Sequence, residues 1–212
     1  MVLNGDTYYK YPAVSNSDLS ALKKLLYGGD NFDPTEAYKF GTLIDCMLTE
    51  PGKVNFFNYT CAGEQYTPEQ FEQARQMKRA FFKDDLARRM LENAETQKIF
   101  HKHVSINEGI KYGFDMKCKF DIWMPSLFWG GDIKSTTATS QKQFEAAARH
   151  FDYDRQRFVY MTLAGSNQDI LIAISKVNFK VFKIPIKRGD EFFQSGQDKY
   201  RELAFQYWNL IA

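Results

Sequence analysis

The spacing of apolar residues predicts a chain in which blocks of helices alternate with blocks of strands. Apolar residues recur every three or four positions, as in amphipathic helices, and capping residues precede several of these segments. The segment from residue 67 begins with Thr67 and Pro68, a typical helix start. The helices predicted in this way cover 14–26, 40–51, 67–94, 140–151, 152–165 and 190–212. Within 67–94, residues 86–94 are predicted to form a second helix.

Segments of alternating or continuous apolar character predict the strands. They cover 59–66, 98–107, 110–125, 126–135 and two strands within 168–186, the first of them almost wholly apolar. Helices therefore come first, then antiparallel strands, then helices, then strands again. This order predicts the α/β (α+β) class, with a central mixed β-sheet flanked by helices. Because no repeat or linker interrupts the pattern, we expect one domain over residues 1–212.

Composition narrows the function classes only a little. The 212 residues are 44% hydrophobic, enough for one sizeable core, and the net charge of +2 does not by itself indicate a polyanionic partner. Cys46, Cys61 and Cys118 lie far apart, which argues against a zinc ribbon, an iron–sulfur cluster or a disulfide scaffold. With no membrane span and no apolar leader in the sequence, we expect a cytoplasmic protein without a membrane partner.

The segment MKCKFDIWMPSLFWGGDIKST carries the main candidate chemistry. Alternation places Met116, Cys118, Phe120 and Ile122 on one apolar face, and Asp121 on the other face with Lys117, Lys119 and Trp123. A turn at Pro125 and Ser126 would set Asp121 opposite Gly130 and Lys119 opposite Asp132. Asp121 and Asp132 would then be diagonal neighbours about 7 Å apart or less, with Lys134 on the same face.

Two carboxylates beside a glycine gap would suit a hard cation such as Mg²⁺, which prefers oxygen ligands. Lys134 on the same face would orient or deprotonate a water on the metal, or stabilise the transition state of phosphoryl transfer. The alternative is an exposed strand face with cross-strand pairs between aspartates and lysines. An Asp-x-Lys sequence by itself does not decide between the two; the second aspartate and the glycine favour the metal site.

The chain resembles the PD-(D/E)XK nuclease superfamily, and within it the RecE-type and lambda-exonuclease-like phage recombination nucleases. Four segments carry the resemblance in the family's order: SNSDLSALKKL, FGTLIDCMLTEP, the pair KCKFD and GGDIKSTTATS, and HFDYDRQRFVYMTLAG. Each segment alone is loosely matched, but the ordered set is fairly specific and spans nearly the whole chain. The resemblance implies a restriction-endonuclease-like core.

The resemblance also implies roles for individual residues. Asp121 and Asp132 would be metal-bridging carboxylates, the carbonyl of Ile133 a further ligand, and Lys134 the catalytic lysine. Gln156 and Tyr160 match the family's Q-x-x-x-Y pair; four positions apart on a helix, they would steady the lysine or contact a phosphate. Asp45 stands where many relatives have His, which leaves its role as a ligand less defined.

The activity implied is that of a Mg²⁺- or Mn²⁺-dependent exonuclease that hydrolyses phosphodiester bonds at the ends of double-stranded DNA, as in phage-type recombination. The alternatives are an endonuclease of the same fold, acting in restriction, repair or defence, and an inactive nuclease-like DNA-binding protein. A ring-shaped homo-oligomer and a single-strand annealing protein as partner are compatible with the resemblance, although the residues themselves indicate neither.

Three further features have two readings each. Ser135 and Thr136 would donate hydrogen bonds to a DNA phosphate, or cap the next helix. His101 and His103 alternate like metal ligands, but no third ligand is evident, and solvent exposure is the simpler reading. A basic helical region would follow a DNA backbone or form a solvated face; it contains Arg75, Lys78, Arg79, Lys83, Arg88 and Arg89.

Overall fold

The computed structural model describes residues 5–28 and 33–211 of the chain. Its centre is a five-stranded mixed sheet in the order β4-β5-β6-β7-β8. β5 pairs antiparallel with both β4 and β6, and β7 pairs antiparallel with β8. β6 and β7 run parallel. The strands are β4 (Glu95–Glu108), β5 (Ile110–Met124), β6 (Trp129–Thr136), β7 (Gln168–Ser175) and β8 (Val181–Lys187).

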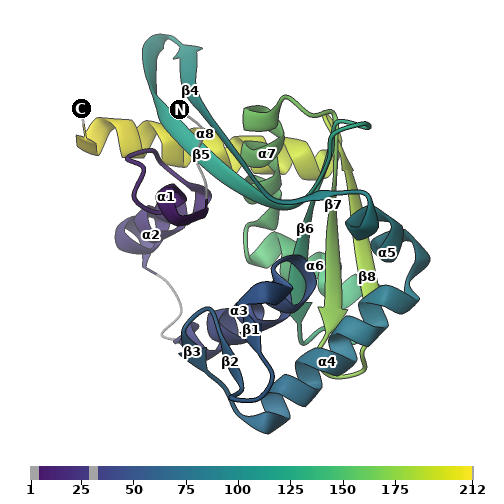
Figure 1. Cartoon of the computed structure of the whole chain (residues 1–212). Coiled ribbons are helices and arrows are strands. Elements are labelled where there is room, and N and C mark those ends of the chain that lie inside the picture. The colour runs from purple at the N-terminus through teal and green to yellow at the C-terminus, as the bar shows by residue number, and fades with distance from the viewer. Residues whose placement is uncertain (1–4, 29–32, 212) are drawn as a thin grey trace.

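Helices cover both faces of this sheet (Figure 1). One core cluster lies between the sheet and α2, α6, α7 and α8, and the other between the sheet and α3, α4 and α5. The predicted mixed sheet flanked by helices is therefore confirmed. The helices are α1 (Gly5–Tyr8), α2 (Asn16–Tyr27), α3 (Thr35–Thr49), α4 (Pro68–Lys83), α5 (Asp85–Glu92), α6 (Gln141–His150), α7 (Tyr153–Ala164) and α8 (Glu191–Ile211).

Local sequence explains where several helices begin and end. Ser15 and Thr67 each form a capping box at the start of α2 and α4, and the side chain of Ser140 caps α6. Gly165 ends α7 in the left-handed conformation that glycine adopts without steric cost. α3 begins at Thr35, earlier than the predicted residue 40, and leads into a short 3₁₀ helix, η1 (Pro51–Lys53).

The single strand predicted over 59–66 is wrong. The chain instead forms a small three-stranded meander of β1 (Val54–Asn55), β2 (Thr60–Cys61) and β3 (Glu64–Gln65). A tight turn separates the last two strands, and both of its residues, Ala62 and Gly63, have positive φ. Apolar and polar residues alternate through such a turn as they do in a strand, so periodicity alone does not reveal it.

The register predicted for β5 and β6 is also wrong. Met124 pairs with Trp129 and Trp123 with Gly130, two positions away from the predicted alignment. The connection is longer than expected because residues 125–128 all lie outside the strands, with Phe128 at a φ of 52°. Gly130 does not leave open space beside Asp121; a Cβ there would lie 2.1 Å from the ring of Phe120.

Alternation along β5 breaks at Asp121. Met116, Cys118 and Phe120 belong to the core cluster under α7, as the pattern predicts, but Ile122 belongs to the cluster under α3. On β4 the facing residue Gln97 has a φ of 55°, and it is not paired with Asp121 although its neighbours on both sides are paired. This local break turns the carboxylate of Asp121 out of the regular pattern.

Among the helices of the described residues, none is both long enough and apolar enough to cross a bilayer.

α7 and α8 lie close together at Gly196. A Cβ at this position would lie 2.2 Å from the carbonyl oxygen of Asp154 and 2.9 Å from the amide nitrogen of Arg155. The glycine therefore allows the terminal helix to pack against the start of α7, where Ser195 and Lys199 donate hydrogen bonds to the Asp154 carboxylate.

We predict that Gly196→Ala lowers the free energy of unfolding by about 1–3 kcal/mol, because overpacking outweighs the better helix propensity of alanine. Urea denaturation measures the change. Gly52→Ala is the matched control, since a Cβ at Gly52 meets no atom within 4 Å. Equal stability of Gly196→Ala and the wild-type protein would contradict the close approach.

Candidate active site

The candidate site lies where β5 separates from β6. Ladder pairing between the two strands ends at Ile122 and Gly131. Asp121 directly precedes Ile122, and its Oδ2 accepts a 2.8 Å hydrogen bond from the backbone N–H of Ile133, two positions beyond Gly131. The carboxylate of Asp121 is thereby fixed in the gap between the strands, next to the strand that carries Asp132 and Lys134.

A buried arginine holds Asp132. Nη2 of Arg157, on α7, lies 3.0 Å from Oδ1 of Asp132, and Nη1 lies 3.4 Å from Oδ2 of Asp169 at the start of β7. All three side chains are almost completely buried. The ring of Tyr160 stacks 4.1 Å from the guanidinium carbon. Arg157 thus crosslinks the central strands and fixes one oxygen of Asp132.

Lys134 contacts the other oxygen of Asp132. Its Nζ lies 2.5 Å from Oδ2 and 4.8 Å from the centre of the Tyr153 ring, and the side chain keeps 19% of its exposure. Burial by itself would lower the pKa of Lys134, but Asp132, Tyr153 and Asp121 together outweigh this effect and raise the pKa above its ordinary value. In this arrangement Lys134 is a cation with limited access to solvent.

Asp45 approaches the site from α3. Both carboxylate oxygens accept hydrogen bonds from Nε2 of Gln97, at 3.3 and 3.2 Å, and Oδ1 also accepts one from Thr49 at 3.0 Å. Asp45 therefore belongs to the same polar cluster, supported by the strand residue whose positive φ breaks the β4–β5 ladder. The sequence did not single out Gln97 or Thr49.

The electrostatics of the two central aspartates differ. Burial, and then the neighbouring Asp45 and Asp132, raise the pKa of Asp121 well above its ordinary value. Burial would raise the pKa of Asp132 as well, but Arg157 and Lys134 outweigh it and lower the pKa. Two cations thus compensate the charge of Asp132, whereas Lys134 and the N–H of Ile133 only partly offset the effect of burial on Asp121.

Gln156 and Tyr160 lie on α7, as the Q-x-x-x-Y spacing predicts, but neither contacts Lys134 in the interactions described above. Tyr160 packs against Arg157 and Phe120 in the core, and the Oε1 atom of Gln156 is buried without a hydrogen-bond partner. The tyrosine beside the lysine is Tyr153, which the sequence reading did not select. Arg157 and Asp169 were missed too, although each stands directly before a run of apolar residues, which was a signal.

Ser135 and Thr136 continue β6 beyond the lysine, and both are partly buried. Oγ1 of Thr136 accepts a hydrogen bond from the N–H of Ala138, and Ser140 rather than either residue caps α6. The capping alternative is therefore wrong for these two residues. A role in phosphate binding remains a prediction.

The residues suit a divalent cation in chemistry, although no metal geometry is preformed. Within residues 5–28 and 33–211, no three His, Cys, Asp or Glu side chains converge on a common metal position. The nearby donors are carboxylate oxygens, the ligands that Mg²⁺ and Mn²⁺ prefer. Oδ2 of Asp132 is buried and makes no hydrogen bond of good geometry, despite the nearby lysine. Asp121, Asp132 and Asp45 would hold the ion.

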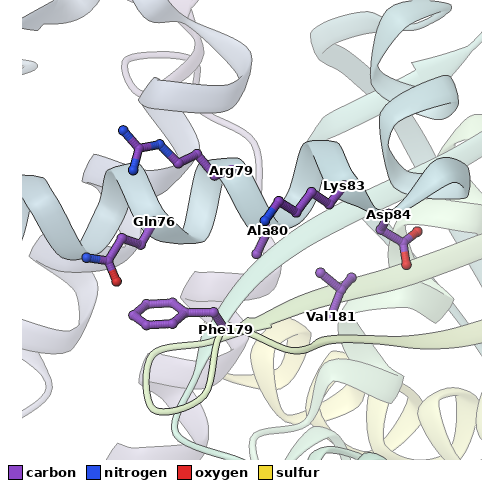
Figure 2. A pocket seen from close by; sticks show the side chains of 7 residues that line it. All are labelled: Gln76, Arg79, Ala80, Lys83, Asp84, Phe179 and Val181. Atoms are coloured by element: carbon purple, nitrogen blue, oxygen red, sulfur yellow. The ribbon is translucent and has the colours of Figure 1, made fainter.

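A hollow between α4 and the 179–181 segment is a poorer candidate (Figure 2). It is lined by Gln76, Arg79, Ala80, Lys83, Asp84, Phe179 and Val181. Its one carboxylate, that of Asp84, is paired with Lys183. The two histidines also form no metal site: His103 pairs with Asp115, and His101 packs against Tyr11.

The comparisons with known proteins concern the family and the fold. A family model described as "PDDEXK-like domain of unknown function (DUF3799)" matches residues 9–212. The structure of a protein described as "Putative exonuclease" from Eubacterium rectale superposes with a TM-score of 0.65 at 17% identity, covering 98% of this chain and 84% of that one. No curated protein is similar enough in sequence to count as a relative.

Two further solved structures are more distant. A phage-related exonuclease from Haemophilus somnus 129PT has a TM-score of 0.44 at 12% identity, with 99% of this chain and 89% of that chain covered. An alkaline exonuclease from Laribacter hongkongensis has a TM-score of 0.33 at 14% identity, with coverage of 93% and 91%. These two values are too low to support an argument. The family model spans nearly the whole chain, and the chain therefore belongs to the PDDEXK-like family DUF3799.

Proposed function

We propose that the protein is a divalent-metal-dependent nuclease that hydrolyses phosphodiester bonds of double-stranded DNA. One observation carries the proposal: Asp121 and Asp132, from β5 and β6, lie with Lys134 where the two strands separate, and Asp45 of α3 is near enough to raise the pKa of Asp121. The ion pairs that stabilise the fold do not account for all of these carboxylates, because Asp121 has no cationic partner of its own among the interactions described. The PDDEXK-like fold is consistent with this chemistry.

When bound, Mg²⁺ or Mn²⁺ would supply Lewis-acid activation of water and phosphate. The residues of this chain do the rest. The ion would be held by the carboxylates of Asp121, Asp132 and Asp45. The carbonyl of Ile133, between Asp132 and Lys134 on β6, would be a further ligand. Lys134, paired to Asp132, would place its ammonium against the phosphate and stabilise the negative charge that develops there. Ser135 and Thr136 would bind the adjacent phosphate.

We further propose that the enzyme acts from DNA ends. The support is the Eubacterium rectale structure, which shares the fold across 98% of this chain and is described as a "Putative exonuclease". A function in phage-type recombination, with a single-strand annealing protein as partner or a ring-shaped homo-oligomer, extends the same proposal. In either setting, the substrate is a duplex end whose phosphate would lie at the carboxylates of Asp121 and Asp132.

The first prediction concerns the substrate. With Mg²⁺ or Mn²⁺, the protein is expected to degrade linear duplex DNA and leave covalently closed circular DNA intact, and Lys134→Ala is expected to lose this activity. Gel electrophoresis of the two DNA forms measures the outcome. Cutting of the circle would indicate an endonuclease, and no cutting of either form by folded protein would indicate a DNA-binding protein without activity.

The second prediction concerns Asp121. Asp121→Asn is expected to lower the hydrolysis rate at least about 100-fold, since metal ligation contributes several kcal/mol to the transition state. Its carboxamide oxygen can still accept the hydrogen bond from Ile133. A carboxyl whose pKa is raised on folding destabilises the fold at neutral pH, so the neutral variant should have an equal or higher Tm without metal.

Thermal unfolding with and without Mn²⁺ tests the same variant. Mn²⁺ should raise the Tm of the wild-type protein and leave that of Asp121→Asn unchanged. A variant that cleaves DNA at the wild-type rate would contradict the assignment of Asp121 as a ligand.

The third prediction concerns Arg157 as a positioning residue for Asp132. Arg157→Lys keeps the charge but loses the planar fork that holds two carboxylates. We expect the metal concentration for half-maximal activity to rise about 10- to 100-fold, the usual effect of changing a group that orients a metal ligand. A titration of activity against Mn²⁺ measures this shift.

Arg155→Lys is the matched control. Arg155 is equally buried on α7, but it contacts Asn16, Ser20 and Asp152 rather than the candidate site. Its substitution should lower the Tm without changing the metal requirement. If both variants shift the metal requirement alike, Arg157 has only a structural role.

A further inference from the structure

The edge of β5 is open beside Asp121. β6 covers this edge only over Ile122–Met124. At the other end, the N-terminal segment takes over: Val14 pairs with Met116, its N–H donates to Asp115 O, and its carbonyl accepts from Lys117 N–H, both at 2.8 Å. The stretch 118–121 lies between these two partners, and it contains Lys119 and Asp121.

A buried lysine fixes the N-terminal segment at this edge. Nζ of Lys117 donates hydrogen bonds to the carbonyl oxygens of Tyr8 and Tyr11, at 2.8 and 2.7 Å, and lies 5.0 Å from the centre of the Tyr8 ring. Lys117 and Tyr8 are both buried. Burial of an ammonium group is costly unless its hydrogen bonds are satisfied, so these contacts define one position for the segment.

Tyr9 is held by this anchored backbone but directs its ring into solvent. It remains 75% exposed, although its neighbour Tyr8 is 7% exposed and the two rings meet edge to face at 5.2 Å. Nζ of Lys119 lies 5.5 Å from the centre of the Tyr9 ring and 5.9 Å from that of Tyr8. Among the described residues, no acidic side chain forms an ion pair with Lys119.

The Tyr9–Lys119 pair is also close to the carboxylate cluster. Lys119 lies two residues before Asp121 on the same open edge. Burial raises the pKa of Asp45, and the charge of Lys119 opposes that rise, which places the ammonium within electrostatic range of the Asp45 carboxylate. An exposed aromatic ring on a fixed backbone and an unpaired cation therefore stand beside the site where hydrolysis is proposed.

We propose that Tyr9 and Lys119 form a nucleotide-binding subsite, in which the Tyr9 ring stacks on a base of the bound strand and Lys119 contacts an adjacent phosphate. Aromatic stacking and a nearby cation are the two components of sequence-independent binding to single-stranded nucleic acid. The proposal deepens the proposed nuclease function and rests on it. It assigns the subsite to the strand whose phosphate lies at the carboxylates.

Other basic surfaces fit this role less well. Arg75 and Arg79 on α4 lie within 4.0 Å of Glu72, and Arg88 and Arg89 on α5 pair with acidic residues of the same helix. Lys78 donates to the carbonyl of Met47. The basic helical region seen in the sequence is thus largely compensated, whereas Lys119 is not.

Fluorescence anisotropy with a labelled twelve-residue oligothymidylate tests the subsite. The measurement is made with the full chain in EDTA, so that binding is read without hydrolysis. Tyr9→Ala is expected to weaken binding about 5- to 100-fold, the range found for loss of one stacked base, and Tyr9→Phe to bind within about twofold of wild type. Lys119→Ala should reduce the salt dependence by about one phosphate contact.

The controls are Phe57→Ala, which removes an even more exposed ring from the β1–β2 connection, and Lys142→Ala, which removes an exposed charge from α6. Neither should change binding more than twofold. If Tyr9→Ala binds like Phe57→Ala while the wild-type protein binds well, the subsite is wrong and the nuclease proposal stands. If the wild-type protein neither binds nor cleaves DNA, both proposals fail.

Discussion

The separation of β5 from β6 at Asp121 is the constraint on which the candidate site depends. In a continuous ladder the N–H of Ile133 would pair with a strand carbonyl. Here that N–H binds the Asp121 carboxylate, and the facing strand accommodates the break through the positive φ of Gln97. A defect in regular pairing thus creates the acidic gap, as often occurs where strands carry functional groups.

The charges around the gap are balanced asymmetrically. Arg157 and Lys134 both contact Asp132, and Asp169 shares Arg157 from the next strand. Such a buried network is stable only because every charge in it has a partner. Asp121 and Asp45 lack a comparable cation, and Asp45 is held by neutral donors. A divalent cation would complete the balance, which is the physical reason to regard the cluster as a metal site.

The sequence predicted the architecture better than the details of the site. Apolar periodicity located most helices and strands, and the alternation of β5 and β6 brought Asp121, Asp132 and Lys134 into consideration. It failed where the backbone leaves regular geometry. The turn before Trp129 is longer than a tight hairpin, so the predicted register of β5 and β6 differs from the observed one by two residues. Phe120 fills the space that was expected beside Gly130.

Long-range partners could not be read from the pattern either. Arg157 meets Asp132 and Asp169 only because α7 packs across β6 and β7. In the sequence alone, the charged residues at the start of α7 look like the solvent-exposed face of a helix. The same limit applies to Tyr9 and Lys119, which are 110 positions apart and meet because Lys117 anchors the N-terminal segment. Periodicity reports which face a residue occupies; packing decides what it meets.

Locating the metal directly tests the central claim. Crystals of the wild-type protein soaked with Mn²⁺ would be measured near the manganese absorption edge, and an anomalous difference map would be calculated. A metal site at the gap between β5 and β6 predicts a peak in contact with the carboxylates of Asp121 and Asp132. Saturating Mn²⁺ with no peak there, or a peak only at another group of residues, would contradict it.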